Sequence, residues 1–243
     1  MAKKKKRKRK APSAPSGGTV EPSTNRAARK EAARREREKA IRAFRRRRLL
    51  RRWAIIGLAL AIVAAGGVLI WSNVRQSSQA REETDALARQ VGCGGVQQPP
   101  DEGRGHVNQP PGYQNSPASS GPHASQQLDP AVSVYDVPFD PAFEFRAVHN
   151  LEHGYVIMYY KQEGENALAG NVVSTLADLA ESERKVILAP YPTLGQDENL
   201  VFVAWNRVRR CEVTGEAGTV RNVAEGFIQE FREGPEAPEP NAP

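Results

Sequence analysis

An uncharged apolar run from Trp53 to Trp71 constrains this chain more than any other feature. As an α-helix the run would be about 28 Å long at ~1.5 Å per residue, which is close to the ~30 Å hydrocarbon core of a bilayer. A tryptophan stands at each end, and indole rings favour the headgroup interface of a membrane. We therefore predict a single transmembrane helix over residues 53–72.

Charge is distributed unevenly about this run. The net charge is +7, but lysine and arginine crowd residues 1–52, whereas the remainder of the chain carries an acidic excess. Positive charge resists translocation, so we expect a single-pass plasma-membrane protein with a cytoplasmic N-terminus and an extracytoplasmic C-terminal domain. A cleaved signal peptide is the alternative. It is disfavoured because the apolar run exceeds the usual ~7–15-residue signal core and because the basic leader is too long.

The basic arm, residues 1–52, is predicted to be disordered at first and then helical. The block Lys3–Lys10 repels itself and cannot be buried, while residues 25–52 contain no proline or glycine and favour a helix. Beside a membrane span, the expected partner of such an arm is the anionic lipid of the inner leaflet. We expect no nucleic-acid partner, because no aromatic residue interleaves the basic run before Phe44.

The residues after the apolar run differ in composition along the chain. We predict a polar helical stalk at 73–92, a Pro/Gly-rich extended segment at 93–130, an α+β (or small α/β) domain at 131–234 and a disordered tail at 235–243. Within the domain, apolar patterning predicts the order strand–helix–strand–strand–helix, with helices packed on a small sheet. The predicted elements cover residues 154–160, 167–184, 185–190, 200–205 and 218–233, and a further short strand is expected at 132–135.

Cys93 and Cys211 are the only cysteines of the chain. In an oxidising compartment the default is a disulfide between them, worth ~4–5 kcal/mol in the chain-entropy model. It would join the start of the extended segment to the end of the third strand. Lipidation of Cys93 is disfavoured because the residue lies far beyond the apolar run. Metal ligation by the two cysteines remains an alternative, although their spacing matches no zinc-finger pattern.

All four histidines fall within one stretch of the chain, at His106, His123, His149 and His153. Imidazole is the commonest protein ligand of Zn²⁺ and Cu²⁺, and histidines on loops can build a site together. We take all four as candidate metal ligands, with Glu152 orienting one of the rings through a hydrogen bond. The alternative is that the four rings only hydrogen-bond loop backbone.

His149-Asn-Leu-Glu-His153 also matches the H-x-x-E-H pattern of inverted zinc peptidases. That chemistry needs both histidines on one face of a stable helix, with the glutamate as general base. Because Gly154 and a predicted strand follow at once, we expect at most one helical turn here. A metal-dependent hydrolase with Glu152 as base is therefore kept only as the alternative to a non-enzymatic module, and no catalytic residue is assigned.

Several short motifs occur in a fixed order along the C-terminal part of the chain. They are Ser120-Gly-Pro-His123, Val134-Tyr135, His149–Val156, Val203-Ala-Trp205 followed by Cys211, and Phe227–Pro235. Over about residues 88–236 these motifs resemble a bacterial, largely actinobacterial family known as domain of unknown function 3105. The family pattern often reads Pro-Pro-Thr-Ser-Gly-Pro-His, whereas this chain has Pro117-Ala-Ser-Ser-Gly-Pro-His123.

The resemblance implies a membrane-anchored or exported protein without an assigned activity. Since two of the motifs contain histidines, it adds weight to a histidine-lined site but supplies no function. We therefore predict a cell-envelope module that either binds a transition metal such as zinc or copper or serves a structural role.

Overall fold

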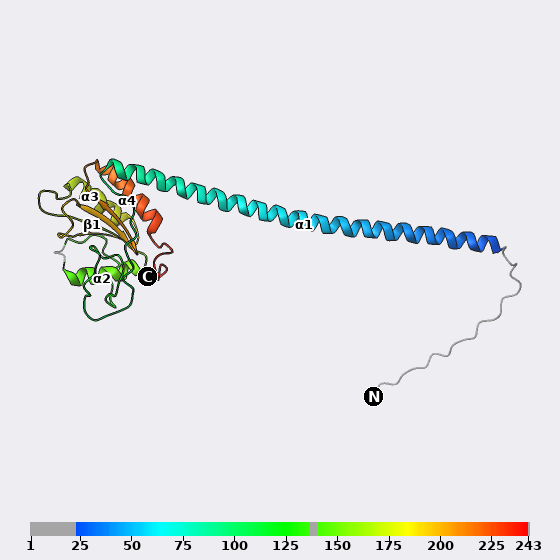
Figure 1. Cartoon of the computed structure of the whole chain (residues 1–243), viewed down its shortest axis with the longest axis horizontal. Helices are drawn as coiled ribbons and strands as arrows, with labels where there is room; N and C mark the ends of the chain where they lie inside the picture. The colour runs from blue at the N-terminus through cyan, green and yellow to red at the C-terminus, as the bar shows by residue number, and fades with distance from the viewer. Residues whose placement is uncertain (1–22, 137–139, 243) are drawn as a thin grey trace, which may run out of the picture. The chain divides into compact units, whose positions relative to one another are not determined.

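A computed structural model describes residues 23–136 and 140–242 of the chain (Figure 1). The chain forms two compact units, Met1–Trp71 and Ser72–Pro243. The block Lys3–Lys10, for which the sequence predicts disorder, lies outside the described residues.

The first unit is dominated by one long helix, α1 (Ser23–Gln90), whose last residues belong to the second unit. The basic segment from Asn25 and the apolar run are continuous within this helix, as the composition predicts. In the described part of the chain, only this helix is long and apolar enough to cross a membrane. Its apolar side chains are exposed, for example Leu58 at 64% and Val63 at 71%.

The second unit is built around a four-stranded sheet with strand order β2-β1-β3-β4. The strands are β1 (Val156–Tyr160), β2 (Val186–Pro190), β3 (Leu200–Ala204) and β4 (Arg207–Cys211). β1 and β2 are parallel and are connected through helix α3 (Gly170–Ser182), because parallel neighbours need a crossover. The other two pairs are antiparallel, so the sheet is mixed and the domain is α+β.

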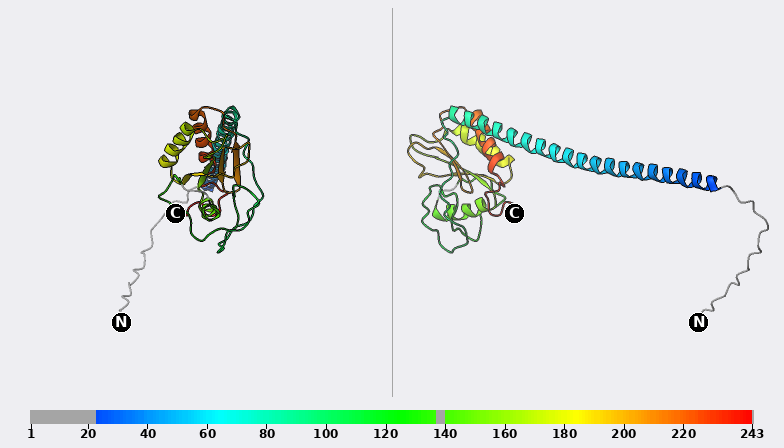
Figure 2. Two further views of the ribbon diagram at one scale, coloured as in Figure 1. Left: turned by 90° about the vertical axis from the view of Figure 1, so that its left-hand side faces the viewer. Right: turned by 45° about the vertical axis from the view of Figure 1, so that its right-hand side comes forward.

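Both faces of the sheet are covered (Figure 1). Helices α3 and α4 (Ala217–Phe231) pack on one face, where Met158 and Phe202 are fully buried. Helix α2 (Pro141–Glu152) and the irregular segment before it cover the other face, where Ile157 and Tyr159 are fully buried. Figure 2 shows the same layers from two other directions.

The five elements of the predicted strand–helix–strand–strand–helix order are confirmed as β1, α3, β2, β3 and α4, each within a few residues. The expected strand at 132–135 is wrong. Only Val134 pairs, in an isolated parallel bridge to Leu188 at the edge of β2, and no ladder continues on either side.

Two elements were not predicted. Strand β4 carries three arginines in five residues, and its two apolar residues, Val208 and Cys211, lie on opposite faces of the sheet, so no apolar alternation marks it as a strand. Helix α2 was replaced in the prediction by a single turn. The order in the structure is therefore longer by one helix and one strand than the sequence suggested.

The segment from Cys93 to Pro130 contains no helix or strand, in agreement with its composition. A disulfide joins Cys93 to Cys211, across a sequence separation of 118 residues. Cys211 ends β4 rather than the third strand, which corrects the predicted position of the link. A backbone bridge between Gln97 and Val208 holds the segment to β4 as well.

Residues 235–242 form turns and bends. Ala237 is buried in the same hydrophobic cluster as the apolar side chains of α2.

Candidate metal centre

Helix α2 positions three of the predicted site residues. Its N-terminus is capped by Asp140, whose carboxylate accepts the amide proton of Phe143 at 2.6 Å, and Pro141 occupies the first helical turn. His149 and Glu152 lie in the last turn of the helix, and His153 is its C-cap. The prediction of at most one helical turn before Gly154 is therefore wrong.

The sequence does contain a signal for this helix. An Asp-Pro pair followed by apolar residues at helical spacing is typical of a capped amphipathic helix. Phe143, Ala147, Val148 and Leu151 are all buried against the sheet. The helix ends because Gly154 has a φ of +80°, and a side chain there would collide with the backbone of Glu233.

The irregular segment supplies the other two histidines. The amide of His123 donates to the carbonyl of Gly105 at 2.9 Å, and the amide of Val107 donates to the carbonyl of His123 at 2.9 Å. These two bonds form a parallel bridge between His106 and His123, which places the two side chains next to each other. Gly121, with a φ of +127°, allows the approach because a Cβ there would lie 2.9 Å from the Tyr113 ring.

The four histidine rings converge at the C-terminal end of α2. The ring centroids of His106, His123 and His149 are 4.9–5.2 Å apart, and those of His149 and His153 are 4.6 Å apart. His123 is fully buried, His149 and Glu152 are nearly so, and His106 is exposed. The cluster is therefore walled on one side by the protein and open to solvent at His106.

Backbone carbonyls fix the orientation of the two buried rings. Nδ1 of His123 donates to the carbonyl of Gly121 at 2.8 Å, and Nδ1 of His149 donates to the carbonyl of Ala124 at 2.7 Å. A carbonyl can only accept, so Nδ1 carries the proton and Nε2 of each neutral ring keeps its lone pair. Nε2 of His123 lies 3.0 Å from Oε2 of Glu152, and Nε2 of His149 lies 3.2 Å from Nε2 of His153.

The electrostatic surroundings favour the neutral form of the central ring. Burial lowers the pKa of His149, and the nearby imidazoles lower it further, although the hydrogen bond to Ala124 acts in the opposite direction. A neutral imidazole is the form that binds a metal ion. Orientation and protonation of His149 are therefore both suited to ligation.

The residues present fit a divalent transition metal. One nitrogen from each of His106, His123 and His149 and one oxygen of Glu152 lie within 4.8 Å of one another. Ligand atoms of a tetrahedral zinc site are about 3.4 Å apart, since each lies ~2.0–2.1 Å from the ion. Small side-chain movements would therefore close this set around an ion. Both cysteines are in the disulfide, which removes the alternative of thiolate ligation.

The structure brings all five predicted site residues together but distributes their roles differently from the sequence interpretation. Glu152 belongs to the four-donor set, whereas the sequence analysis placed it behind a ligand ring. His153 lies beside that set, between Nε2 of His149 and the carboxylate of Glu239 at 3.6 Å.

Two supporting residues occur in the quoted motifs but were given no role at the site. Trp205 packs edge-on against His123, with ring centroids 6.3 Å apart. Asn150, fully buried on α2, accepts the amide proton of Leu128 at 2.8 Å and so holds the irregular segment to the helix. A polar residue on the apolar face of a helix was the available signal for Asn150, once the helix itself had been recognised.

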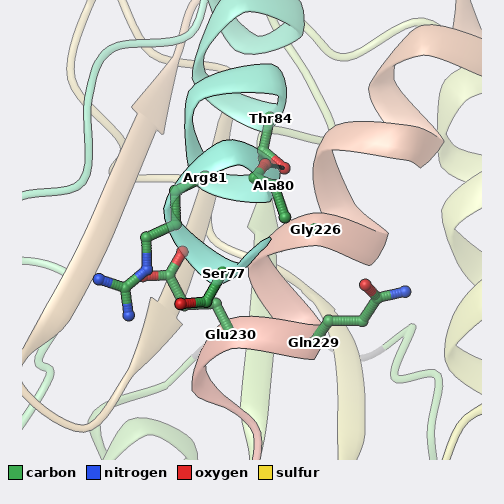
Figure 3. Close-up of a pocket in the computed structure, with 7 residues that line it drawn as sticks. All are labelled: Ser77, Ala80, Arg81, Thr84, Gly226, Gln229 and Glu230. Atoms are coloured by element: carbon green, nitrogen blue, oxygen red, sulfur yellow. Dashed lines mark hydrogen bonds and ion pairs between the residues drawn. The ribbon is translucent and has the colours of Figure 1, made fainter. Parts of the chain in front are cut away.

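A separate hollow of about 310 Å³ lies on the helical side of the second unit, between α4 and the end of α1 (Figure 3). Its lining includes Arg81 and Glu230, which form an ion pair at 2.8 Å. Because these two charges neutralise each other and no histidine or cysteine lines the hollow, it offers no metal-binding chemistry.

The second unit is thus an α+β domain with a histidine–glutamate cluster on one face of its sheet. A family model described as a protein of unknown function (DUF3105) matches residues 106–243, and the chain belongs to this family. The matched residues include every member of the cluster. This matched region begins and ends later in the chain than residues 88–236, over which the motifs resemble the family. No curated protein and no solved structure matches the chain.

Proposed function

We propose that the Ser72–Pro243 unit binds a divalent transition-metal ion through His106, His123, His149 and Glu152. The observation that carries this proposal is the orientation of the two buried rings. Backbone carbonyls occupy Nδ1 of His123 and of His149, so that both Nε2 lone pairs are directed into a cluster that contains a carboxylate. Metal-ligating histidines are commonly held by such a second hydrogen bond.

The alternative, in which the rings only brace loop backbone, accounts for the Nδ1 contacts but not for the meeting of three imidazoles and a carboxylate at one point. A neutral His153 ring can donate its Nε2 proton to Nε2 of His149 at 3.2 Å, so this contact fits both alternatives. A cation bound by the donor set would use the histidine nitrogens and the Glu152 carboxylate together. The donor set contains nitrogen and oxygen and no sulfur, which favours Zn²⁺ over Cu⁺.

Metal analysis of the full chain, purified in detergent without chelators, tests this function. We expect one zinc or similar ion per chain and a Kd below about 10 μM by calorimetry. His149→Ala or His123→Ala should weaken binding by about 100-fold or more, since losing even a residue that only orients a ligand costs about 10–100-fold. Gln126→Ala, an exposed neighbour of the site, is the matched control and should bind as the wild type does. Undiminished binding in His149→Ala would refute the assignment.

We further propose that this unit is extracytoplasmic and that α1 anchors it in the plasma membrane. The exposed apolar side chains of α1 need a covering that water does not supply, and a bilayer of matching thickness supplies it. The arginines before Trp53 favour a cytoplasmic N-terminus and contact with anionic inner-leaflet lipid. The Cys93–Cys211 disulfide fits an oxidising compartment. A reporter enzyme that is active only after export should be active when it is fused after Pro243. If instead a cytosolic reporter fused there is active and the export-dependent reporter is not, this orientation is contradicted.

The hydrolase alternative can be tested at one residue. The H-x-x-E-H residues do lie at the end of a stable helix, so the original objection to this chemistry does not hold. However, Oε2 of Glu152 lies 3.0 Å from Nε2 of His123, which suits a ligand better than a base acting on a water molecule. Glu152→Gln should weaken metal binding if the carboxylate is a ligand. Retained metal binding with loss of a measurable hydrolytic activity would instead support the enzyme.

A further inference from the structure

The C-terminal tail, residues 235–242, lies against the histidine–glutamate cluster. The amide of Glu239 donates to the backbone carbonyl of Glu152 at 3.0 Å, and the Glu239 carboxylate lies 3.6 Å from Nε2 of His153. Ala237 is buried in the hydrophobic cluster that contains the apolar side chains of α2. The tail is therefore packed on the end of α2 that carries one donor of the proposed metal site and the C-cap histidine.

Lys185 joins the tail to His153 through backbone groups. Its Nζ donates to the carbonyl of His153 at 3.0 Å, and also to the carbonyls of Pro240 at 3.1 Å and Ala242 at 2.6 Å. The side chain of Lys185 is only 11% exposed, so these bonds are largely shielded from water. They keep the Glu239 carboxylate close to the His153 ring.

Two groups compete for one lone pair on His149. Because Nδ1 of His149 donates to the carbonyl of Ala124, a metal ion would use the lone pair on Nε2. The same lone pair can accept the Nε2 proton of His153 at 3.2 Å. A nitrogen bonded to a metal ion cannot accept a hydrogen bond as well. Metal binding therefore has to displace the N–H group of His153.

Glu239 offers an acceptor for the displaced N–H group. At 3.6 Å its carboxylate is just beyond hydrogen-bond distance from Nε2 of His153, so a small rotation of the ring brings it into range. A hydrogen bond to an ionised carboxylate is stronger than one between two neutral groups. His153 keeps its proton throughout, and only the acceptor changes.

We propose that metal binding switches the His153 hydrogen bond from His149 to Glu239 and thereby holds the C-terminal tail more firmly against the site. This inference rests on the metal site proposed above and makes Glu239 a positioning residue of that site. Such coupling is reciprocal, so a tail held by the bound ion strengthens binding of the ion by the same factor. Because the Glu239 side chain is 60% exposed, the tail carries the state of a largely buried centre to the protein surface.

Hydrogen–deuterium exchange of the full chain in detergent, with and without Zn²⁺, tests the switch. The Glu239 amide is itself a reporter, because it donates to the carbonyl of Glu152. We expect Zn²⁺ to slow exchange of a peptide covering residues 235–242 by about 2–10-fold, which is the effect of one net hydrogen bond. Glu239→Ala should abolish this slowing and weaken Zn²⁺ affinity by a similar factor. Glu239→Gln, whose amide oxygen can still accept from His153, should restore part of both effects.

Glu236→Ala is the matched control. Glu236 also tethers the tail, but through an ion pair with Arg207 of β4 at 3.1 Å. Its loss should speed exchange of the tail to the same extent with and without Zn²⁺. The Zn²⁺-dependent slowing should therefore remain in this variant.

The outcomes separate the two proposals. Failure of Zn²⁺ to bind the wild-type chain would overturn the metal site and the switch together. Normal Zn²⁺ binding without slower exchange of the tail would overturn the switch alone, and so would loss of the slowing in both Glu239→Ala and Glu236→Ala. His153→Ala should bind Zn²⁺ and lose the slowing. If this variant instead loses Zn²⁺ as His149→Ala does, His153 is a ligand and the switch is refuted.

Discussion

The two faces of the sheet are built differently, although the same strands supply both. On the α3–α4 face, Met158 and Phe202 pack against helices, and the core is apolar apart from Arg209, which pairs with Asp85. On the α2 face, Ile157 and Tyr159 lie under a single helix and a long irregular segment. The buried polar residues of this face include Ser119, Ser120, His123, His149, Asn150 and Glu152, and three of them, His123, His149 and Glu152, belong to the candidate donor set.

The difference follows from backbone hydrogen bonding. A helix satisfies its own peptide groups, so it can present an almost wholly apolar surface to the sheet. An irregular segment cannot, and its buried amides need side-chain partners. Asn150 accepts from Leu128, and Glu144 accepts from the amide of Ala118 at 2.8 Å. The irregular face is therefore necessarily rich in polar groups, and the histidine–glutamate cluster lies where these groups converge.

The first prediction concerns the helical face. Phe202→Ala should lower the free energy of unfolding by about 3–5 kcal/mol, because Phe202 is fully buried and packs on Phe227 with ring centroids 5.6 Å apart. Denaturant titration of the full chain in detergent measures this loss. The loss should be the same with and without chelator. A loss that depends on chelator would show that the two faces are energetically coupled.

The second prediction concerns the link between the start of the irregular segment and the sheet. Replacing Cys93 and Cys211 together by serine should cost about 2–5 kcal/mol, because the disulfide closes a long loop. Limited proteolysis should then cut first within residues 93–130, while α3 and α4 remain protected. Equal protection of that segment in both proteins would show that the Gln97–Val208 bridge is sufficient.

The third prediction isolates one side-chain contact on the irregular face. Asn150→Ala should destabilise the chain by about 1–3 kcal/mol, because the buried amide of Leu128 would lose its acceptor. Asn171→Ala, at an exposed position of α3, is the matched control and should change stability by less than about 0.5 kcal/mol. Similar effects of the two substitutions would remove the distinction between the faces.

The fourth and smallest effect is a pH dependence. Burial raises the pKa of Glu144 above its usual 4.5, and the hydrogen bonds from Ala118 and Tyr191 offset this only in part. A raised folded-state pKa of an acid gives stability that is present below pH 4.5 and is lost as the pH rises through the folded-state pKa. Glu144→Gln should remove this part of the pH profile of unfolding. An unchanged profile in Glu144→Gln would assign the dependence to another group.

Much of the helical face could be predicted from the sequence, and less of the irregular face. β1, β2 and β3 are continuous apolar runs because they are buried on both sides, and α3 and α4 show a clear helical period. α2 could not be predicted as easily, because Gly154 directly after the second histidine favours a turn and conceals the helix that precedes it. β4 was missed because arginine dominates its composition, although Arg209 is buried through its pairing with Asp85.

The sequence by itself determined the apolar helix, the strands with uniform apolar character and the chemistry of the candidate ligands. These depend on local patterns, or on residue types that occur only a few times. Only the tertiary structure decided which donors meet. His106 reaches His123 through a backbone bridge between positions far apart in the chain, and Glu152 joins them because the helical period of α2 turns it toward His123. Such juxtapositions arise from how separate segments pack on one sheet, and no local pattern records them.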